Sequence, residues 1–341
     1  MKKFGLTLVT MIVLLSSHLF AAGEGGWRTY PSVGSERCNG FPILSTKDRM
    51  YFLNDLGIEK GHIASNSTAQ WSWYVTFEAK GNMTMSASDK YLYLMGGYQS
   101  WGPNSWRLDD IYVFTLNAES TGQQVRTGKL SVAKDKFESL VIKDKLYVFG
   151  GNGAWMNYYS TVEYTDSDPN SASFGTWSTA PSMKLIQGPV FSAFTVGNKV
   201  VCFGVRVDLE TTERPLYTEA ADIHEDGTLG PWSVIGGPFK TDYPVGAVFR
   251  PDSTLFVLCE KVDDMNKCYI MDFSHGVQTG LQFKQVTPLS PGELFVGGND
   301  VGLGCHDRFV FLVQNNNCIY DPLLTSAPLF EESNSDSNLY E

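Results

Sequence analysis

The sequence is short of positive charge. Lysine and arginine together number 26, against 37 aspartate and glutamate residues, which gives a formal net charge of −11. No basic stripe interrupts this excess of acid. The long-range field of the protein therefore opposes binding to a nucleic-acid backbone or to an anionic membrane surface. We expect no nucleic-acid partner.

The sequence also lacks the short motifs that mark several enzyme classes. It contains no Gly-x-Ser-x-Gly elbow, no phosphate-binding glycine loop and no His-Glu-x-x-His segment. Acyl transfer, nucleotide chemistry and zinc-dependent hydrolysis thus have no recognisable site. Acid pairs such as Asp109-Asp110 are poor candidates for glycoside chemistry, because adjacent residues on a strand point to opposite faces. We expect no cofactor.

The one long apolar run lies at the N-terminus. Two lysines precede a run from Phe4 to Phe20, and Ala21-Ala22-Gly23 follows it. This layout predicts a signal peptide over residues 1–22, a mature chain without membrane insertion, and a secreted (periplasmic or extracellular) location. An uncleaved anchor is the alternative, although no stop-transfer flank or lipidation cysteine follows. Residues 331–341 are acidic and rich in serine and asparagine, which predicts a disordered tail.

Cysteine is sparse but even in number. All six cysteines lie after the signal segment, which permits disulfides in an exported protein. Cys259 and Cys268 are the best candidates for a pair, because they flank one short connection between neighbouring strands. Buried free thiols are the alternative, and Cys202 in particular lies inside an apolar run.

What the sequence does contain is a repeated apolar strand. The second apolar residue of each run serves as a reference, and the references are Tyr51, Tyr93, Tyr147, Val201, Phe256 and Val310. Their spacings are 42, 54, 54, 55 and 54 residues, a period typical of β-propellers rather than of helical solenoids. We therefore predict an all-β, six-bladed propeller that forms a single domain over residues 23–330.

Each repeat is consistent with four strands. In the third repeat, Lys143-Asp144-Lys145 is a turn between the first strand and the apolar second strand. A third strand follows a variable loop, and tryptophan marks the fourth. Trp27, Trp177 and Trp232 each precede a reference residue by 24 positions. Because Trp27 comes before the first full repeat, we expect an N-terminal strand around it to complete the last blade and close the ring.

The second strands of repeats two and three end in double glycines, Gly96-Gly97 and Gly150-Gly151. Together with the aromatic third strand and the tryptophan, these residues resemble the kelch motif, and the resemblance covers nearly the whole mature chain. Repeats one, five and six lack the double glycine. The resemblance implies a kelch-type propeller of the exported bacterial kind. Such propellers include binding platforms, copper radical oxidases similar to galactose oxidase, and a sialic-acid epimerase.

A copper oxidase needs two histidines, two tyrosines and a cysteine around one metal. The repeat register places His62 in a loop between second and third strands. It places His224, His275 and His306 in turns on the opposite face, each in a different blade. Because such residues do not converge on one point, we expect no metal site.

Loops between second and third strands emerge on one face of a propeller, where function usually resides. Two of these loops, in adjacent blades, are rich in aromatic residues, which stack on sugars or anchor protein partners. Arginines on the same face suit a carboxylate. The predicted binding residues are Tyr98, Trp101, Trp106, Arg107, Trp155, Tyr158, Arg206 and Arg214.

Two functions stay open from the sequence. The first is an exported module that binds a glycan or a protein through this loop face. The alternative is a carbohydrate-active enzyme, such as a sialic-acid epimerase-like or galactose-oxidase-like protein. The aromatic residues have a structural alternative as well, since they could cover their own loops and pack on each other.

Overall fold

The computed structural model describes residues 43–46, 49–54, 57–63, 69–76, 80–101, 104–116, 121–207, 214–239, 244–250, 255–262, 265–286, 301–306 and 309–314. These residues form β-strands and one short 3-10 helix, η1 (Ala154–Met156). Within these ranges, no helix is long and apolar enough to cross a membrane. The predicted signal peptide, the strand around Trp27 and the acidic tail lie outside the described residues.

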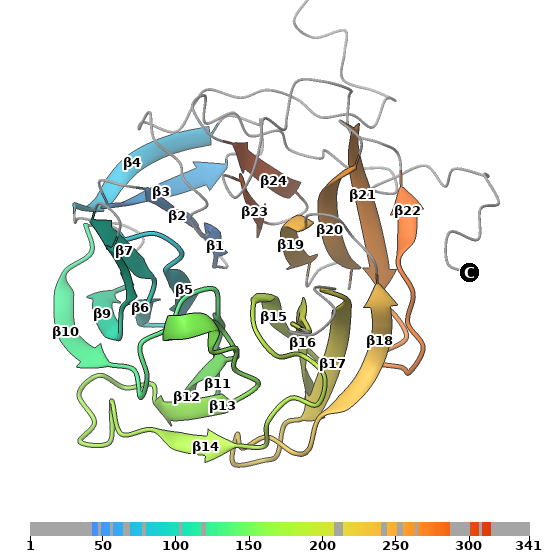
Figure 1. Cartoon of the computed structure of the whole chain (residues 1–341). Coiled ribbons are helices and arrows are strands. Elements are labelled where there is room, and N and C mark those ends of the chain that lie inside the picture. Colours follow the sequence, from blue (N-terminus) through green and yellow to red (C-terminus); the bar gives the residue numbers. More distant parts are fainter. Residues whose placement is uncertain are drawn as a thin grey trace, which may run out of the picture.

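Antiparallel sheets stand around a common axis (Figure 1), and we number them as blades 1 to 6 along the chain. Blade 1 contains β1 (Ile43–Ser45), β2 (Met50–Asn54), β3 (Gly57–Ile63) and β4 (Ala69–Thr76). Blade 2 contains β5 (Thr84–Ala87), β6 (Tyr91–Met95), β9 (Asp110–Thr115) and β10 (Gln124–Lys129). Blade 3 contains β11 (Glu138–Ile142), β12 (Lys145–Phe149), β13 (Val162–Asp166) and β14 (Ser178–Ala180).

The second half of the ring continues in the same way. Blade 4 contains β15 (Val190–Val196), β16 (Lys199–Val205), β17 (Leu216–Asp222) and β18 (Ser233–Phe239). Blade 5 contains β19 (Pro244–Arg250), β20 (Leu255–Val262), β21 (Met265–Asp272) and β22 (Lys284–Val286). Blade 6 shows two strands among the described residues, β23 (Val301–His306) and β24 (Phe309–Gln314). A separate hairpin, β7 (Tyr98–Trp101) with β8 (Asn104–Arg107), is inserted in blade 2.

The first strand of every blade lies innermost, and these strands form a closed ring. Neighbours contact each other in the order β1, β5, β11, β15, β19 and β23, and β23 contacts β1 again. The all-β propeller built from four-stranded sheets is therefore confirmed. Whether an N-terminal strand completes blade 6 stays a prediction, because that segment is not among the described residues.

The reference residues all lie in second strands, as the repeat predicted. These strands are apolar on both faces because each blade packs between two others. In β12, for example, Leu146, Tyr147, Val148 and Phe149 are fully buried. Ile142 pairs with Lys145 in β12, which confirms the predicted turn at Lys143-Asp144. Blade 1 is shorter because Asn54 pairs directly with Gly57, so only two residues connect β2 and β3.

The double glycines join each blade to the next. Gly150 and Gly151 have φ values of 62° and 100°, and Gly96 and Gly97 repeat this geometry with 61° and 96°, in a region that side chains disfavour. The Gly97 amide donates to the Lys134 carbonyl (3.0 Å), at the entrance to blade 3. The Gly151 amide donates to the Gly188 carbonyl (2.8 Å), at the entrance to blade 4.

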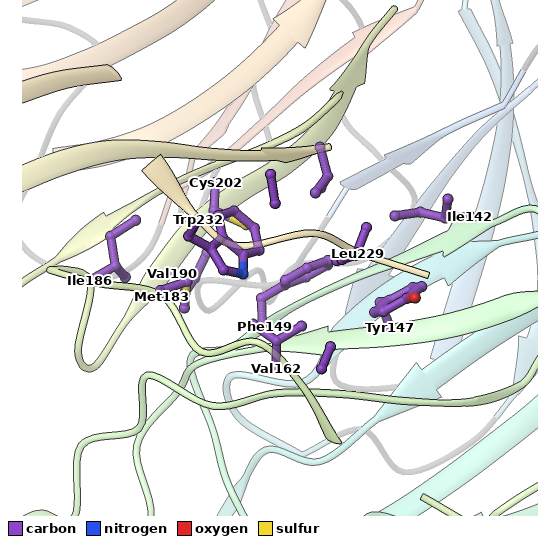
Figure 2. Packing of buried hydrophobic residues seen from close by; sticks show 13 residues of the cluster. Ile142, Tyr147, Phe149, Val162, Met183, Ile186, Val190, Cys202, Leu229 and Trp232 are labelled. Atoms are coloured by element: carbon purple, nitrogen blue, oxygen red, sulfur yellow. The ribbon is translucent and has the colours of Figure 1, made fainter. Parts of the chain in front are cut away.

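The tryptophans that mark fourth strands also link neighbouring blades. The Trp177 indole donates to the Lys129 carbonyl at 2.7 Å, and the Trp232 indole donates to the Pro181 carbonyl at 2.8 Å. Trp232 packs edge-on against Phe149, with ring centroids 6.0 Å apart (Figure 2). The equal spacing of these tryptophans thus reflects one repeated contact between blades.

In blades 3 and 4, the third strand carries a glutamate at the same position of its pairing with the second strand. Glu163 and Glu219 each pair with the residue that follows the reference residue of their blade. Glu219 is fully buried and accepts the backbone amides of residues 184–186 at 2.6–2.7 Å. Glu163 accepts from Lys134 Nζ (3.0 Å) and Ser131 Oγ (2.6 Å). Each carboxylate therefore fixes the connection that enters its own blade.

Candidate functional site

One face of the ring gathers the variable connections. Because neighbouring strands are antiparallel, second strands end, third strands begin and blade-to-blade connections lie at the same end of each sheet. We call this end the loop face. In blades 2 to 4 its described residues are 80–83, 96–101, 104–109, 131–137, 150–161, 181–189, 205–207 and 214–215.

The first aromatic loop is a β-hairpin rather than an irregular loop. Tyr98 pairs with Arg107, and Gln99 pairs with Trp106, across β7 and β8. Because side chains alternate along a strand, Trp106 and Arg107 lie on opposite faces of this hairpin. Trp106 is exposed. Trp101 lies in β7, but its side chain is outside the described set.

Tyr98 has a structural contact of its own. Its amide donates to the Gly81 carbonyl at 2.7 Å, and its ring lies so close to Gly81 that a Cβ there would approach the ring to 2.5 Å. Tyr98 therefore holds the hairpin against the entrance to blade 2.

The second aromatic loop presents Trp155 to solvent. This side chain is 95% exposed, and its backbone adopts φ 56° and ψ 40° within η1. A bulky residue in the left-handed region costs roughly 1–2 kcal/mol. The turn is closed by hydrogen bonds from Gly153 N to Asn157 O (2.7 Å) and from Asn157 N to Ala154 O (3.2 Å). Strained backbone of this kind gathers at functional sites.

A buried aspartate ties the hairpin to blade 3. Oδ1 of Asp135 lies 3.0 Å from Nε of Arg107, and Oδ2 accepts from Nδ2 of Asn82 at 3.2 Å. The Asp135 side chain is 3% exposed. Sequence reasoning did not select Asp135 or Asn82, because nothing in a blade-to-blade connection distinguishes a buried acid from a solvated one.

The two aromatic loops meet through the backbone of Asp135. It exchanges two hydrogen bonds with Asn152, at 2.9 and 2.8 Å, and Asn152 forms a bridge with Tyr158. The Asn152 Oδ1 atom is buried and accepts no hydrogen bond from any residue that the structure describes. A Cβ placed on Gly188 would lie 3.7 Å from it, so this acceptor faces the entrance to blade 4.

The loop face continues into blade 4. The Gln187 side chain donates to the Tyr158 carbonyl at 3.4 Å, and Gln187 bridges Arg206 through the backbone. The Arg206 amide donates to the Pro215 carbonyl at 2.9 Å, next to Arg214. Both arginine side chains are exposed. The predicted binding residues thus lie along one rim of the loop face, over blades 2 to 4, in which hydrogen bonds connect the neighbouring segments. The Trp101 side chain is not among the described parts of this rim.

A titratable group lies where this rim meets the inner strands. Glu138 is the first residue of β11, and its carboxylate accepts hydrogen bonds from the Thr84 hydroxyl of blade 2 and the Ser139 amide. The residue keeps part of its surface open to solvent. Its carboxyl group is nevertheless enclosed, and burial raises its pKa to about 8. Glu138, Thr84 and Ser192 each pair with the residue two positions after the reference residue of their blade. They therefore occupy equivalent positions in the first strands of three adjacent blades.

The histidine placement from the sequence was wrong in one respect. His62 lies in strand β3, paired with Gln70, rather than in a loop between second and third strands. It is near the strand end remote from the loop face, so it shares a face with His224 and His275, in different blades. Only two residues connect β2 and β3 in blade 1, so this connection ends before His62, which lies within β3. Across the ranges given above, no three His, Cys, Asp or Glu residues cluster as metal ligands would.

The cysteines divide into two cases. Cys202 is a buried free thiol in β16, and burial raises its pKa well above the usual range. Cys259 and Cys268 pair directly opposite each other in β20 and β21. The backbone register therefore places the two residues as the predicted disulfide requires, and the bond itself stays a prediction.

Comparison with known proteins identifies the fold. No family model and no curated protein matches the sequence. Among solved structures, the match to the structure of YjhT has a TM-score of 0.61 at 12% identity and covers 86% of this chain and 95% of the YjhT chain. YjhT is a kelch-repeat β-propeller. The described chain therefore has the kelch-repeat β-propeller fold that the sequence resemblance implied.

Proposed function

We propose that this protein is an exported propeller that binds a glycan on the loop face of blades 2 to 4. The observation that carries the proposal is Trp155, an indole that is 95% exposed and held on a left-handed backbone. Packing of the fold gains nothing from such a side chain, whereas a flat aromatic ring stacks well on the apolar face of a sugar. Hydrogen-bonding groups from blades 2 to 4 lie on the same face of the ring.

The test is a glycan array probed with the full chain and two variants. Trp155→Ala removes the exposed ring, and we expect it to abolish binding without lowering the melting temperature. Trp73→Ala is the matched control, because Trp73 is also exposed but lies in the outer strand of blade 1. Equal binding by all three proteins would contradict the proposal, as would the absence of any bound glycan.

Glu138 favours a second function, acid–base catalysis on a sugar. A carboxyl group with a pKa of about 8 is largely protonated at neutral pH and can both donate and accept a proton. It lies at the inner end of the proposed binding face. YjhT, whose fold this chain shares, is a sialic acid mutarotase, and an activity of this type is the enzymatic candidate here.

Proton NMR tests this second function directly. A freshly dissolved single anomer of N-acetylneuraminate is followed to its anomeric equilibrium with and without the full chain. We expect the protein to accelerate equilibration, and Glu138→Gln to lower the rate by about a hundredfold or more, as expected for the loss of a general acid or base. A rate equal to that in buffer would leave only the binding function.

A further inference from the structure

Arg107 is held from one side only. Its Nε atom lies 3.0 Å from Oδ1 of Asp135, while the other carboxylate oxygen accepts from Asn82 at 3.2 Å. A purely structural arginine–carboxylate pair is often bidentate, with two parallel hydrogen bonds. Here Asn82 occupies the second oxygen, so the carboxylate binds the guanidinium through Nε alone.

The remaining donors of Arg107 are unused. A guanidinium has five N–H donors, of which four are on the two terminal nitrogens. Within the described ranges of the chain, those terminal nitrogens have no hydrogen-bond partner. The side chain is 27% exposed, against 3% for Asp135. The guanidinium is thus fixed at Nε, and the donors of its terminal nitrogens keep their full capacity.

This arrangement suits the recognition of a planar anion. Two terminal N–H groups of an arginine match the two oxygens of a carboxylate, whereas a lysine offers only a point charge. The net charge of −11 repels anions at long range. Recognition of an anion therefore depends on a local cation that is already oriented before the ligand arrives.

We propose that Arg107 is the carboxylate-recognising residue of the glycan site and that Asp135 and Asn82 are its positioning residues. The inference rests on the proposed function and narrows its ligands to sugars that bear a carboxylate. Asp135 acts through Arg107, because its own side chain is buried. Through its backbone bonds to Asn152, it also fixes the loop of Trp155 relative to the guanidinium.

The experiment compares matched sugars that differ in one group. D-Glucuronate and D-glucose differ in a carboxylate against a hydroxymethyl group, and N-acetylneuraminate and its methyl ester differ in a free against a masked carboxylate. Dissociation constants are measured by ligand-detected NMR for the full chain and for Arg107→Lys, Asp135→Asn, Arg206→Lys and Arg126→Lys. Arg206 is the competing arginine on the loop face, and Arg126, in the outer strand β10 and bonded to the Ser171 carbonyl at 3.2 Å, is the matched control outside that face.

We expect the native chain to bind the acidic member of at least one pair about tenfold or more tightly, a factor of ten being about 1.4 kcal/mol. Arg107→Lys and Asp135→Asn should reduce this ratio to within about twofold, and Arg126→Lys should leave it unchanged. A ratio is the deciding quantity, because a general structural defect weakens both members of a pair equally.

Two results would overturn the inference, and they differ from failure of the proposed function. Equal binding of both members by the native chain would remove the carboxylate preference but leave glycan binding in place. A ratio that Arg206→Lys abolishes and Arg107→Lys preserves would assign the carboxylate to blade 4. Glycan binding itself fails only if no sugar binds and the array is empty.

Discussion

Nζ of Lys134 lies 3.0 Å from Oε2 of Glu163, with the lysine side chain 1% exposed and the glutamate side chain 17% exposed. The ammonium also lies over the rings of Phe137 and Tyr159, 5.9 and 5.6 Å from their centroids. Burial lowers the pKa of Lys134, and the carboxylate opposes this change. The pair joins the entrance of blade 3 to its third strand, directly beside Asp135.

Glu163→Gln should destabilise the fold, because it leaves a buried ammonium without its counter-ion. We expect a loss of about 2–4 kcal/mol in the free energy of unfolding, measured by urea denaturation. Lys134→Met is the matched control, since it removes the buried charge and leaves Glu163 bonded to Ser131 and partly in water. A larger loss in the control than in Glu163→Gln would contradict this account of the pair.

Glu138 should make the fold less stable as the pH rises. The pKa of its carboxyl is about 8 in the folded protein and near 4.5 in the unfolded chain. Between these values the folded state binds more protons, so the free energy of unfolding falls with pH and levels off above about 8. Its side of β11 faces Thr84 of β5, which is not titratable, and neither β5 nor β15 carries a titratable residue. The ionisable groups near this strand include Lys145 and Tyr147 of β12, Lys134 and Asp135 of the preceding connection, and the Cys202 thiol of β16, which interacts electrostatically with Glu138.

Glu138→Gln isolates this contribution. The variant should lose the decline between pH 5 and 8 and should melt at a higher temperature than the native chain at pH 8.5. The comparison is made by thermal unfolding at a series of pH values. Parallel curves for the two proteins would show that Glu138 titrates in its normal range.

Gly151→Ala should be more damaging than another substitution at positive φ. A Cβ on Gly151 would lie 2.8 Å from Cβ of Phe137 and 3.0 Å from the Asp135 carbonyl oxygen, whereas Gly175, with φ 83°, has nothing within 4 Å. Gly175→Ala therefore measures backbone strain alone, about 1–2 kcal/mol. We expect Gly151→Ala to cost at least about 1 kcal/mol more in urea denaturation. Equal losses would mean that the entrance to blade 3 adapts freely.

Cys259 and Cys268 should form a cross-strand disulfide when the protein folds in the oxidising compartment to which we propose it is exported. Val262 pairs with Met265 next to the turn, and pairs along antiparallel strands alternate in hydrogen bonding, which gives the cysteine pair a non-hydrogen-bonded position. Cα atoms there are about 4.5 Å apart, within the range that a disulfide accepts. Mass spectrometry of non-reduced digests should find the linked peptides. Cys202 is the internal control, because it should react with alkylating agents only after unfolding. A linkage of Cys259 or Cys268 to any other cysteine would refute this pairing.

The propeller architecture could be predicted from the sequence because each feature of a blade recurs in several repeats. The spacing of apolar second strands, the turn at Lys143-Asp144 and the tryptophans before fourth strands each recur, so one irregular repeat does not obscure the pattern. The residues of the candidate site were harder to predict. Asp135 and Glu138 look like ordinary surface acids in the sequence, and only the packing of adjacent blades encloses them.

The inserted hairpin illustrates the same limit. The segment from Tyr98 to Arg107 contains turn-forming residues and no apolar alternation, which predicts a loop. Pairing across β7 and β8 arises instead from anchoring at both ends, where Tyr98 bonds to Gly81 and Arg107 to Asp135. Those anchors belong to other connections of the ring and leave no local signal.

The tryptophans give this protein two optical reporters in very different surroundings. Trp232 is 1% exposed between blades 3 and 4, whereas Trp155 is 95% exposed on the loop face. A water-soluble quencher reaches the second and not the first, so a ligand that shields Trp155 lowers quenching while the buried indole keeps its short-wavelength emission. In a variant that keeps these two of the eight tryptophans and carries phenylalanine at the other six, occupancy of the face and integrity of the ring can therefore be followed separately in a single fluorescence titration, without any label.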